Sequence, residues 1–172
     1  MSIDPTLNTI TFSGANIFIN SGSSATDDGG SLTGLGNLVI GYDENTGSDA
    51  KTGSHNLIIG SYHNYTSYGG LITGTYNTIS APYATVTGGT QNTASAEGAS
   101  VSGGIYNTAS ASHSSISAGE SGTASGSLSS ICGGYYGIAS GEYSMIGGGD
   151  TNTASGNYSS VTAGVANTAS AL

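Results

Sequence analysis

The stretch that decides the fold is NTASGNYSSVTAGVANTAS (Asn152–Ser170), in which the word NTAS occurs twice, fifteen residues apart. A step of fifteen keeps four residue types in phase over much of the chain. The columns are serine at 80, 95, 110, 125, 140, 155 and 170; glycine at 74, 89, 104, 119, 134, 149 and 164; Val or Ile at 86, 101, 116, 131, 146 and 161; and alanine at 94, 109, 124, 139, 154 and 169. A disordered Gly/Ser tract has no reason to keep such a phase, so the repeat predicts an ordered fold.

The fifteen-residue period predicts the coil of a narrow parallel β-solenoid, with two short strands and two tight turns. It is too short for a helical-hairpin repeat, which needs more than about thirty residues. In the stretch 99–104, Ala99 and Val101 share one face of a strand and Ser100 the other. In the stretch 92–95, Asn92 and Ala94 share a face. Each coil is therefore expected to bury one aliphatic residue among Ala, Gly and Ser.

Two further columns concern turns. Asparagine at 77, 92, 107, 152 and 167 exchanges with Gly122 and Gly137. Since Asn and Gly both tolerate a positive φ, this exchange predicts a left-handed turn position and not a ladder of Asn side chains. The column from Gly74 to Gly164 holds no Asn. It requires either a φ that only Gly adopts or a backbone too close for a Cβ, and the sequence leaves both causes open.

The chain divides into three predicted regions. Residues 1–35 form an N-terminal cap with pairing strands and a linker, in which 9–20 reads as two alternating strands around Ser13-Gly14 and 21–30 as a loop. Residues 36–89 form irregular capping coils that are richer in bulky residues, as in the stretches NLVIGY, NLIIGSY and GLITGTY. Residues 90–172 form the regular coils.

Composition excludes several classes of function. The net charge is −9 and Lys51 is the only Lys or Arg, which argues against nucleic-acid binding and against electrostatic binding to anionic lipid. No apolar run reaches the roughly 20 residues of a membrane span, so no membrane insertion is expected. No signal peptide is visible, which predicts either a fragment of a larger exported chain or a protein assembled inside a cell, as phage parts are. Cys132 is the only cysteine, so no intrachain disulfide forms.

The sparse core favours assembly. One Val or Ile per coil contributes roughly 1.5–3 kcal/mol on burial, whereas ordering each of the fifteen backbones costs roughly 1–2 kcal/mol. The sequence also ends in NTASAL without a capping change, which predicts an open edge on the last coil. Both features favour an oligomer or a continuing fibre.

Three coils carry a family resemblance: ASGSLSSICGG (124–134), ASGEYSMIGGG (139–149) and ASGNYSSVTAG (154–164). They resemble the head repeats of trimeric autotransporter adhesins, the YadA-like heads, over about residues 36–172. The resemblance implies a left-handed parallel β-roll, three chains around one axis, and an adhesive or fibre role. Related repeats also occur in phage tail fibres.

Enzyme chemistry is not expected. Glu97, Glu120, Glu142 and Asp150 are expected to form no repeated pair for acid–base work. His113 occupies a variable outward or turn position.

No cofactor or metal is expected either. His55 and His63 read as structural or solvated residues. Asp43, Asn45 and Asp49 alternate as in calcium loops, but the later bidentate acid is replaced by Ser54, so a solvated acidic insertion is the preferred interpretation.

Two surfaces are candidates for binding. Tyrosines occupy two slots, Tyr83, Tyr143 and Tyr158 in one and Tyr76, Tyr106 and Tyr136 in the other, and exposed Tyr suits protein or carbohydrate contact, although packing over turns or between chains is an alternative. Thr at 93, 108, 123, 153 and 168 beside the Ser column gives a Thr-x-Ser face like that of ice-binding solenoids, although Thr and Ser also simply suit strand surfaces and Ile138 interrupts the column.

The sequence therefore predicts a non-enzymatic homotrimeric β-roll that serves as a fibre segment or adhesin head, located outside the cell, on the cell surface or on a virion fibre. Its partners are expected to be its own copies and a host-surface protein or glycan. A phage tail-fibre receptor-binding module and an ice-binding solenoid are the alternatives.

Overall fold

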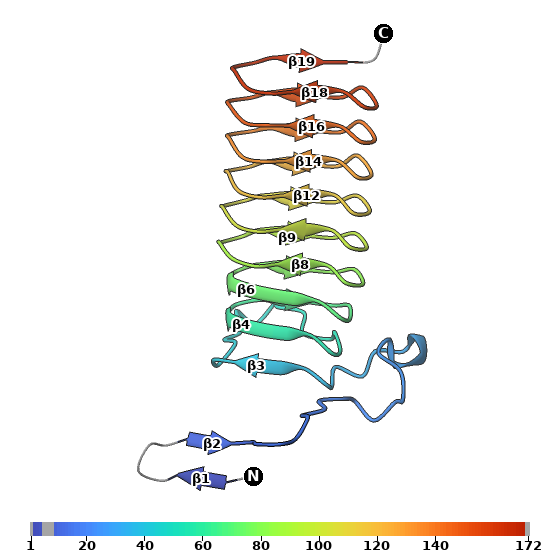
Figure 1. Ribbon diagram of the computed structural model, residues 1–172, viewed down its shortest axis with the longest axis vertical. Coiled ribbons are helices and arrows are strands. Elements are labelled where there is room, and N and C mark those ends of the chain that lie inside the picture. The colour runs from blue at the N-terminus through green and yellow to red at the C-terminus, as the bar shows by residue number, and fades with distance from the viewer. Residues whose placement is uncertain (1, 5–8, 171–172) are drawn as a thin grey trace.

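The computed structural model describes residues 2–4 and 9–170, and it shows an all-β parallel β-solenoid with one short 3-10 helix, η1 (Asp28–Gly30). Successive coils stack along one axis, with the N-terminal segment at one end of the stack and strand β19 (Thr168–Ala169) at the other (Figure 1). The parallel solenoid predicted from the period is confirmed.

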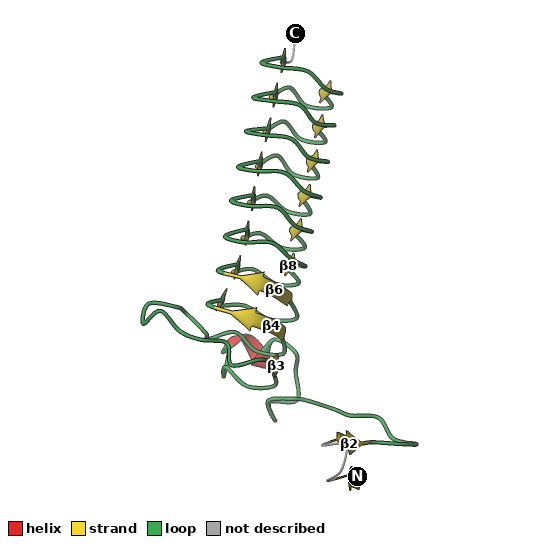
Figure 2. Ribbon diagram, turned by 90° about the vertical axis from the view of Figure 1, so that its left-hand side faces the viewer, coloured by secondary structure: helices red, strands yellow, loops and turns green. Residues whose placement is uncertain are grey.

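Each regular coil contributes one strand to each of two parallel sheets. The first, the β3–β18 sheet, contains β3 (Leu38–Ile40), β4 (Leu57–Ser61), β6 (Leu71–Thr75), β8 (Thr85–Val86), β10 (Ser100–Val101), β12 (Ser115–Ile116), β14 (Ser130–Ile131), β16 (Met145–Ile146) and β18 (Ser160–Val161). The second, the β5–β19 sheet, contains β5 (Asn64–Tyr65), β7 (Thr78–Ile79), β9 (Thr93–Ala94), β11 (Thr108–Ala109), β13 (Thr123–Ala124), β15 (Ile138–Ala139), β17 (Thr153–Ala154) and β19 (Thr168–Ala169). The two sheets lie on opposite sides of a thin stack (Figure 2).

The core is as narrow as the alternation predicts. Val101 pairs in register with Ile116 of the next coil, and both are buried from the β3–β18 sheet. Ala94 pairs with Ala109 in the same way and is buried from the β5–β19 sheet. Because small Ala faces one Val or Ile across each coil, the two sheets approach closely enough to exclude solvent without large side chains.

The asparagine column lines this core, and the prediction of a left-handed turn position is wrong. Asn77, Asn92 and Asn107 are fully buried and none has a positive φ. The Asn92 Oδ1 accepts the backbone N–H of Asn107 at 2.9 Å, and its Nδ2 donates to the carbonyl of Gly104 at 2.9 Å. The column is therefore an Asn side-chain ladder, which satisfies buried backbone groups where the strand ladder is interrupted by a turn.

Left-handed residues lie elsewhere, in two columns that we call edge 1 and edge 2. Edge 1 comprises the turns at 74–76, 89–91, 104–106, 119–121, 134–136, 149–151 and 164–166, and edge 2 the turns at 81–83, 96–98, 111–113, 126–128, 141–143 and 156–158. The third residue of each turn has φ between 49° and 63°. Its N–H points back to the preceding coil, as from Tyr106 to the Thr90 carbonyl (3.2 Å) and from His113 to the Glu97 carbonyl (2.9 Å). The left-handed backbone is unfavourable for a non-Gly residue, and this inter-coil hydrogen bond offsets part of that conformational cost.

The strict glycine column has both of the causes that the sequence left open. Gly104 has φ +89°, and a Cβ on it would lie 2.1 Å from the carbonyl oxygen of Gly119 in the next coil. The same pattern holds at Gly89 and Gly149. A side chain is therefore excluded by backbone conformation and by space at once.

The N-terminal region differs in part from the prediction. Strand β2 (Thr9–Thr11) pairs antiparallel with β1 (Ser2–Asp4), but residues 15–20 form no strand, so the second of the two predicted strands is wrong. Neither strand joins the solenoid sheets. Alternation alone did not produce a strand here because no neighbouring edge in the described chain pairs with these residues.

Candidate functional site

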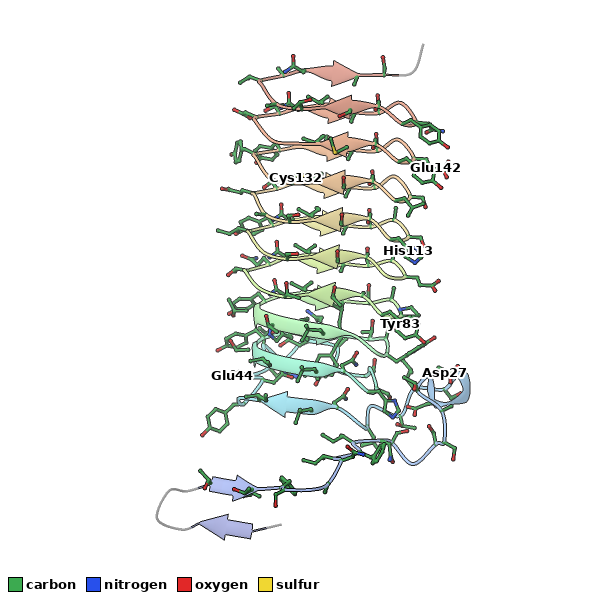
Figure 3. All side chains as sticks on the ribbon, in the orientation of Figure 1. Asp27, Glu44, Tyr83, His113, Cys132 and Glu142 are labelled. Atoms are coloured by element: carbon green, nitrogen blue, oxygen red, sulfur yellow. The ribbon has the colours of Figure 1, made fainter. Side chains whose placement is uncertain are left out.

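The acidic side chains lie apart along the two edges. Glu97 and Glu142 are on edge 2, whereas Glu120 and Asp150 are on edge 1. Figure 3 shows Tyr83, His113 and Glu142 along one side of the stack. Two coils separate Glu120 from Asp150 and three separate Glu97 from Glu142, so neither pair lies in adjacent coils.

Edge 2 carries Tyr83, Tyr143 and Tyr158, as the sequence predicted, and all three are exposed. Two rings on this edge, those of Tyr83 and His113, lie against the turn of the preceding coil. A Cβ on Gly98 would lie 2.9 Å from the His113 ring, and one on Gly69 would lie 2.9 Å from the Tyr83 ring. Where no Gly precedes, rings stack directly, as Tyr143 does on Tyr158, with centroids 5.0 Å apart and an interplanar angle of 6°. Edge 2 is thus a row of ordered side chains that project into solvent.

Edge 1 carries the second tyrosine column. Tyr76, Tyr106 and Tyr136 are between 45% and 52% exposed. Tyr62 precedes them in the column and stacks on Tyr76 with centroids 4.6 Å apart. The hydrogen bond with Tyr136 is the main cause that raises the pKa of Tyr135, and the charges of Glu120 and Asp150 add to it. The tyrosines of both predicted slots are therefore exposed and lie on opposite edges of the stack, with other residue types between them.

The acidic insertion does not bring together Asp43, Asn45 and Asp49, the three residues that alternate as in calcium loops. Asp43 is buried, pairs with the Lys51 ammonium at 3.0 Å and accepts the Tyr65 hydroxyl at 3.1 Å. Asn45 instead accepts the N–H of Gly47 at 2.6 Å, and Asp49 accepts both the N–H and the hydroxyl of Thr46.

These three side chains are therefore engaged by groups of the insertion itself, by Lys51 and by Tyr65. Within residues 2–4 and 9–170, no three His, Cys, Asp or Glu side chains are grouped as metal ligands would be. Burial, with a contribution from Asp43, raises the pKa of Tyr65 to about 12. Asp43 is thus a buried partner of Lys51 and Tyr65, not the solvated acid that the preferred interpretation assumed.

A buried carboxylate that the sequence reasoning missed anchors the N-terminal loop. Asp28 accepts hydrogen bonds from the hydroxyls of Ser21, Ser23 (2.7 Å) and Ser54 (2.6 Å), and from the N–H of Thr33 (2.7 Å). The Ser21 hydrogen bond is the main cause that lowers the pKa of Asp28. These hydrogen bonds fix the loop at 21–33 to the first coils. The DDGG run was the available signal, but its partners lie up to 26 residues away.

His55 secures the same loop from the solenoid side. Its Nδ1 donates to the Thr26 carbonyl at 2.9 Å, and its Nε2 accepts the N–H of Ser21 at 3.0 Å. A shallow pocket of about 420 Å³ lies between this ring and residues 19–26. Because both ring nitrogens are used, His55 reads as a structural residue.

His63 takes the place of asparagine in the ladder. It is fully buried, and its Nδ1 accepts the N–H of Asn77 at 3.3 Å while its Nε2 lies 3.3 Å from the Ile59 carbonyl. This arrangement fits the neutral tautomer with hydrogen on Nε2. Burial lowers the pKa of His63. Its role is to start the ladder.

Neither a protein-family model nor a curated protein matches the sequence. The fold and the repeat define the class, a parallel β-solenoid repeat protein. Among the described residues, no helix has the length and apolarity needed to cross a membrane.

Proposed function

We propose that the chain is a non-enzymatic fibre segment or adhesin head that acts as a homotrimer outside the cell, on a cell surface or on a virion fibre. The observation that carries this proposal is the set of exposed tyrosines that recur in one turn position on each edge of the stack. Tyrosine offers a large apolar area and a hydroxyl at low entropic cost, which suits binding to a protein or glycan surface. The separated acids favour attachment over catalysis.

The test uses a panel of purified extracellular-matrix proteins and immobilised glycans as probes. The double variant Tyr143→Ser and Tyr158→Ser removes the stacked pair on edge 2, and binding to any probe that the native protein captures is expected to fall at least about tenfold. Thr108→Ser on the flat β5–β19 sheet is the matched control and should bind normally. Equal binding by all three proteins would remove the tyrosines from the contact surface.

A phage tail-fibre module is the alternative within the same class, because its geometry would also present edge side chains to a receptor. Bacterial surface polysaccharide is the discriminating probe. Binding to that polysaccharide, without binding to the matrix proteins, would favour the tail-fibre role.

A second function, ice binding, has one supporting observation. Thr78, Thr93 and Thr108 stack in parallel register on the outer face of the β5–β19 sheet, beside the exposed Ser column. Strand spacing then repeats their hydroxyls every ~4.8 Å. Ile138 interrupts the row. Thermal hysteresis of the purified protein tests this function, and its absence at high concentration would remove it.

A further inference from the structure

The first three strands of the β3–β18 sheet are apolar on both faces. Val39, Ile58 and Ile72 form the inner column, in which Ile58 and Ile72 are fully buried. Alternation therefore turns the residues on either side of them outward. The outward set, which we call the Leu/Ile cluster, comprises Leu38, Ile40, Leu57, Ile59 and Leu71.

Within the part of the chain that the structure describes, this cluster is partly exposed. On β3, the end strand of the sheet, Leu38 is 44% and Ile40 is 52% exposed, and the inner residue Val39 is 41% exposed. The other three members of the cluster are half-buried. In later coils the same two columns hold mainly Thr and Ser, as at Thr85 and Thr87; the exceptions are Cys132, Met145 and Gly147. Parallel strands with apolar residues on both faces are those covered on both faces. The cluster therefore has the composition of a buried surface.

The absence of charged residues on the outer face of the β3–β18 sheet favours a second copy of this chain as the surface that covers the cluster. The outer positions of the β3–β18 sheet hold no Asp, Glu, Lys or Arg: Leu38, Leu57, Leu71, Thr85, Ser100, Ser115, Ser130, Met145 and Ser160 in one column, and Ile40, Ile59, Thr73, Thr87, Ser102, Ser117, Cys132, Gly147 and Thr162 in the other. The acids of the regular coils lie on the edges instead. Copies that each carry a net charge of −9 can therefore meet on this face with little like-charge repulsion.

The sizes of the side chains along this face also favour contact with a second copy of the chain. In a cyclic assembly whose axis is parallel to the stack, each coil meets the same coil of its neighbours. The bulky Leu/Ile ends then meet one another, and the small Thr and Ser residues above them allow close approach. Met145, which is 39% exposed, is a further apolar residue in the same column, separated from Leu71 by Thr85, Ser100, Ser115 and Ser130. At equivalent levels the other sheet presents polar Asn64 and Thr78 instead.

We propose that the outer face of the β3–β18 sheet is the contact surface between copies of this chain, with the Leu/Ile cluster at its centre. The proposal rests on the homotrimer proposed above and assigns the face that the homotrimer buries. The β5–β19 sheet and the edges then remain free for other partners.

The first test is the double variant Leu57→Thr and Ile59→Thr, with molar mass measured by light scattering across a concentration series. Thr already occupies these columns at Thr85 and Thr87, so strand formation is preserved. Dissociation to one-chain mass is expected, with association weakened at least about a hundredfold. The matched control, Ile138→Thr, makes the same change on the opposite sheet and should keep the native mass.

A second measurement on the unaltered chain covers the case in which the double variant does not fold. Cys132 lies in an outer column of the same face and is exposed in the single chain (Figure 3). In the assembly, its reaction with a maleimide should be at least about tenfold slower than that of a Cys at Ser125 on the other sheet, placed in a Cys132→Ser background.

The outcomes separate the two proposals. A double variant that keeps three-chain mass, or fast labelling of Cys132 in an assembled protein, overturns the choice of face and leaves the homotrimer standing. One-chain mass for the native protein overturns the homotrimer itself. One-chain mass with slow labelling of Cys132 shows that the single chain itself shields this face, which also overturns the assignment to a second copy.

Discussion

Asn92 accepts the backbone N–H of Asn107 through its Oδ1 at 2.9 Å, and Asn107 in turn accepts the N–H of Gly122 at 2.9 Å. Each Asn thus links its own coil to the next inside the solenoid. The ladder therefore adds hydrogen bonds between coils to the stabilisation that the sparse aliphatic core provides.

Replacing Asn107 with Ala should lower the free energy of unfolding by about 2–3 kcal/mol, because buried backbone groups lose their partners. The groups affected are the Gly122 N–H and the carbonyls of Gly103 and Gly119. Urea unfolding followed by circular dichroism measures the change. Asn167→Ala is the control, since Asn167 is exposed and should cost less than about 1 kcal/mol. Equal losses for the two variants would show that the ladder contributes little.

Extending the ladder should stabilise the protein. Gly137 occupies the Asn column without a positive φ, and a Cβ there would meet only ordinary contacts at 3.5 Å or more. Gly137→Asn should therefore add about 1–2 kcal/mol through new hydrogen bonds and a stiffer unfolded chain.

The contrasting variant for this prediction is Gly134→Asn. Its Cβ would lie 2.3 Å from the Gly149 carbonyl oxygen, at a φ of +98°, so it should be destabilising. A melting temperature that moves in the same direction for Gly137→Asn and Gly134→Asn would contradict the account of both columns.

The buried serine column offers a third prediction. The Ser144 hydroxyl is buried and has no hydrogen-bond partner among the described residues, whereas the Ser114 hydroxyl donates to the Ala111 carbonyl at 2.7 Å. Ala84 and Ala99 occupy the same column in earlier coils. Ser144→Ala should therefore be neutral or stabilising, and Ser114→Ala should cost about 1 kcal/mol. Chemical denaturation of both variants measures the difference, and the reverse order would refute it.

His63 should make stability fall on mild acidification. Its pKa is lowered in the folded state below the usual 6.5, so the unfolded chain binds the proton first. Stability is therefore complete above about pH 6.5 and declines as the pH drops from there toward the folded pKa. His63→Asn should remove this decline, because Asn fits the ladder at any pH. His113→Asn leaves His63 intact and should keep the native profile of melting temperature against pH.

Much of the solenoid could be predicted because its rules repeat. The fifteen-residue phase at Ser95, Gly104 and Val101 predicted the coil, the thin core and the strand faces. The Asn column was misread because exchange between Asn107 and Gly122 fits a turn and a ladder equally well in sequence. The left-handed positions escaped notice because Tyr83 and Tyr106 are not residues that favour a positive φ.

The N-terminal anchor could not be predicted, for a different reason. Asp28, Ser21 and Ser54 meet only through tertiary folding, and none belongs to the repeat. Likewise, the bulky residues at Leu38 and Leu57 signalled unusual coils, but only the register showed which of them point outward. Periodicity predicts what recurs along the stack, whereas single contacts outside the period require the structure.

The most direct measurement is the molar mass of the purified protein by light scattering coupled to size exclusion, from low micromolar concentration upward. The proposed function predicts a species of three times the 16.7 kDa chain mass. A species of 16.7 kDa at every concentration would contradict it.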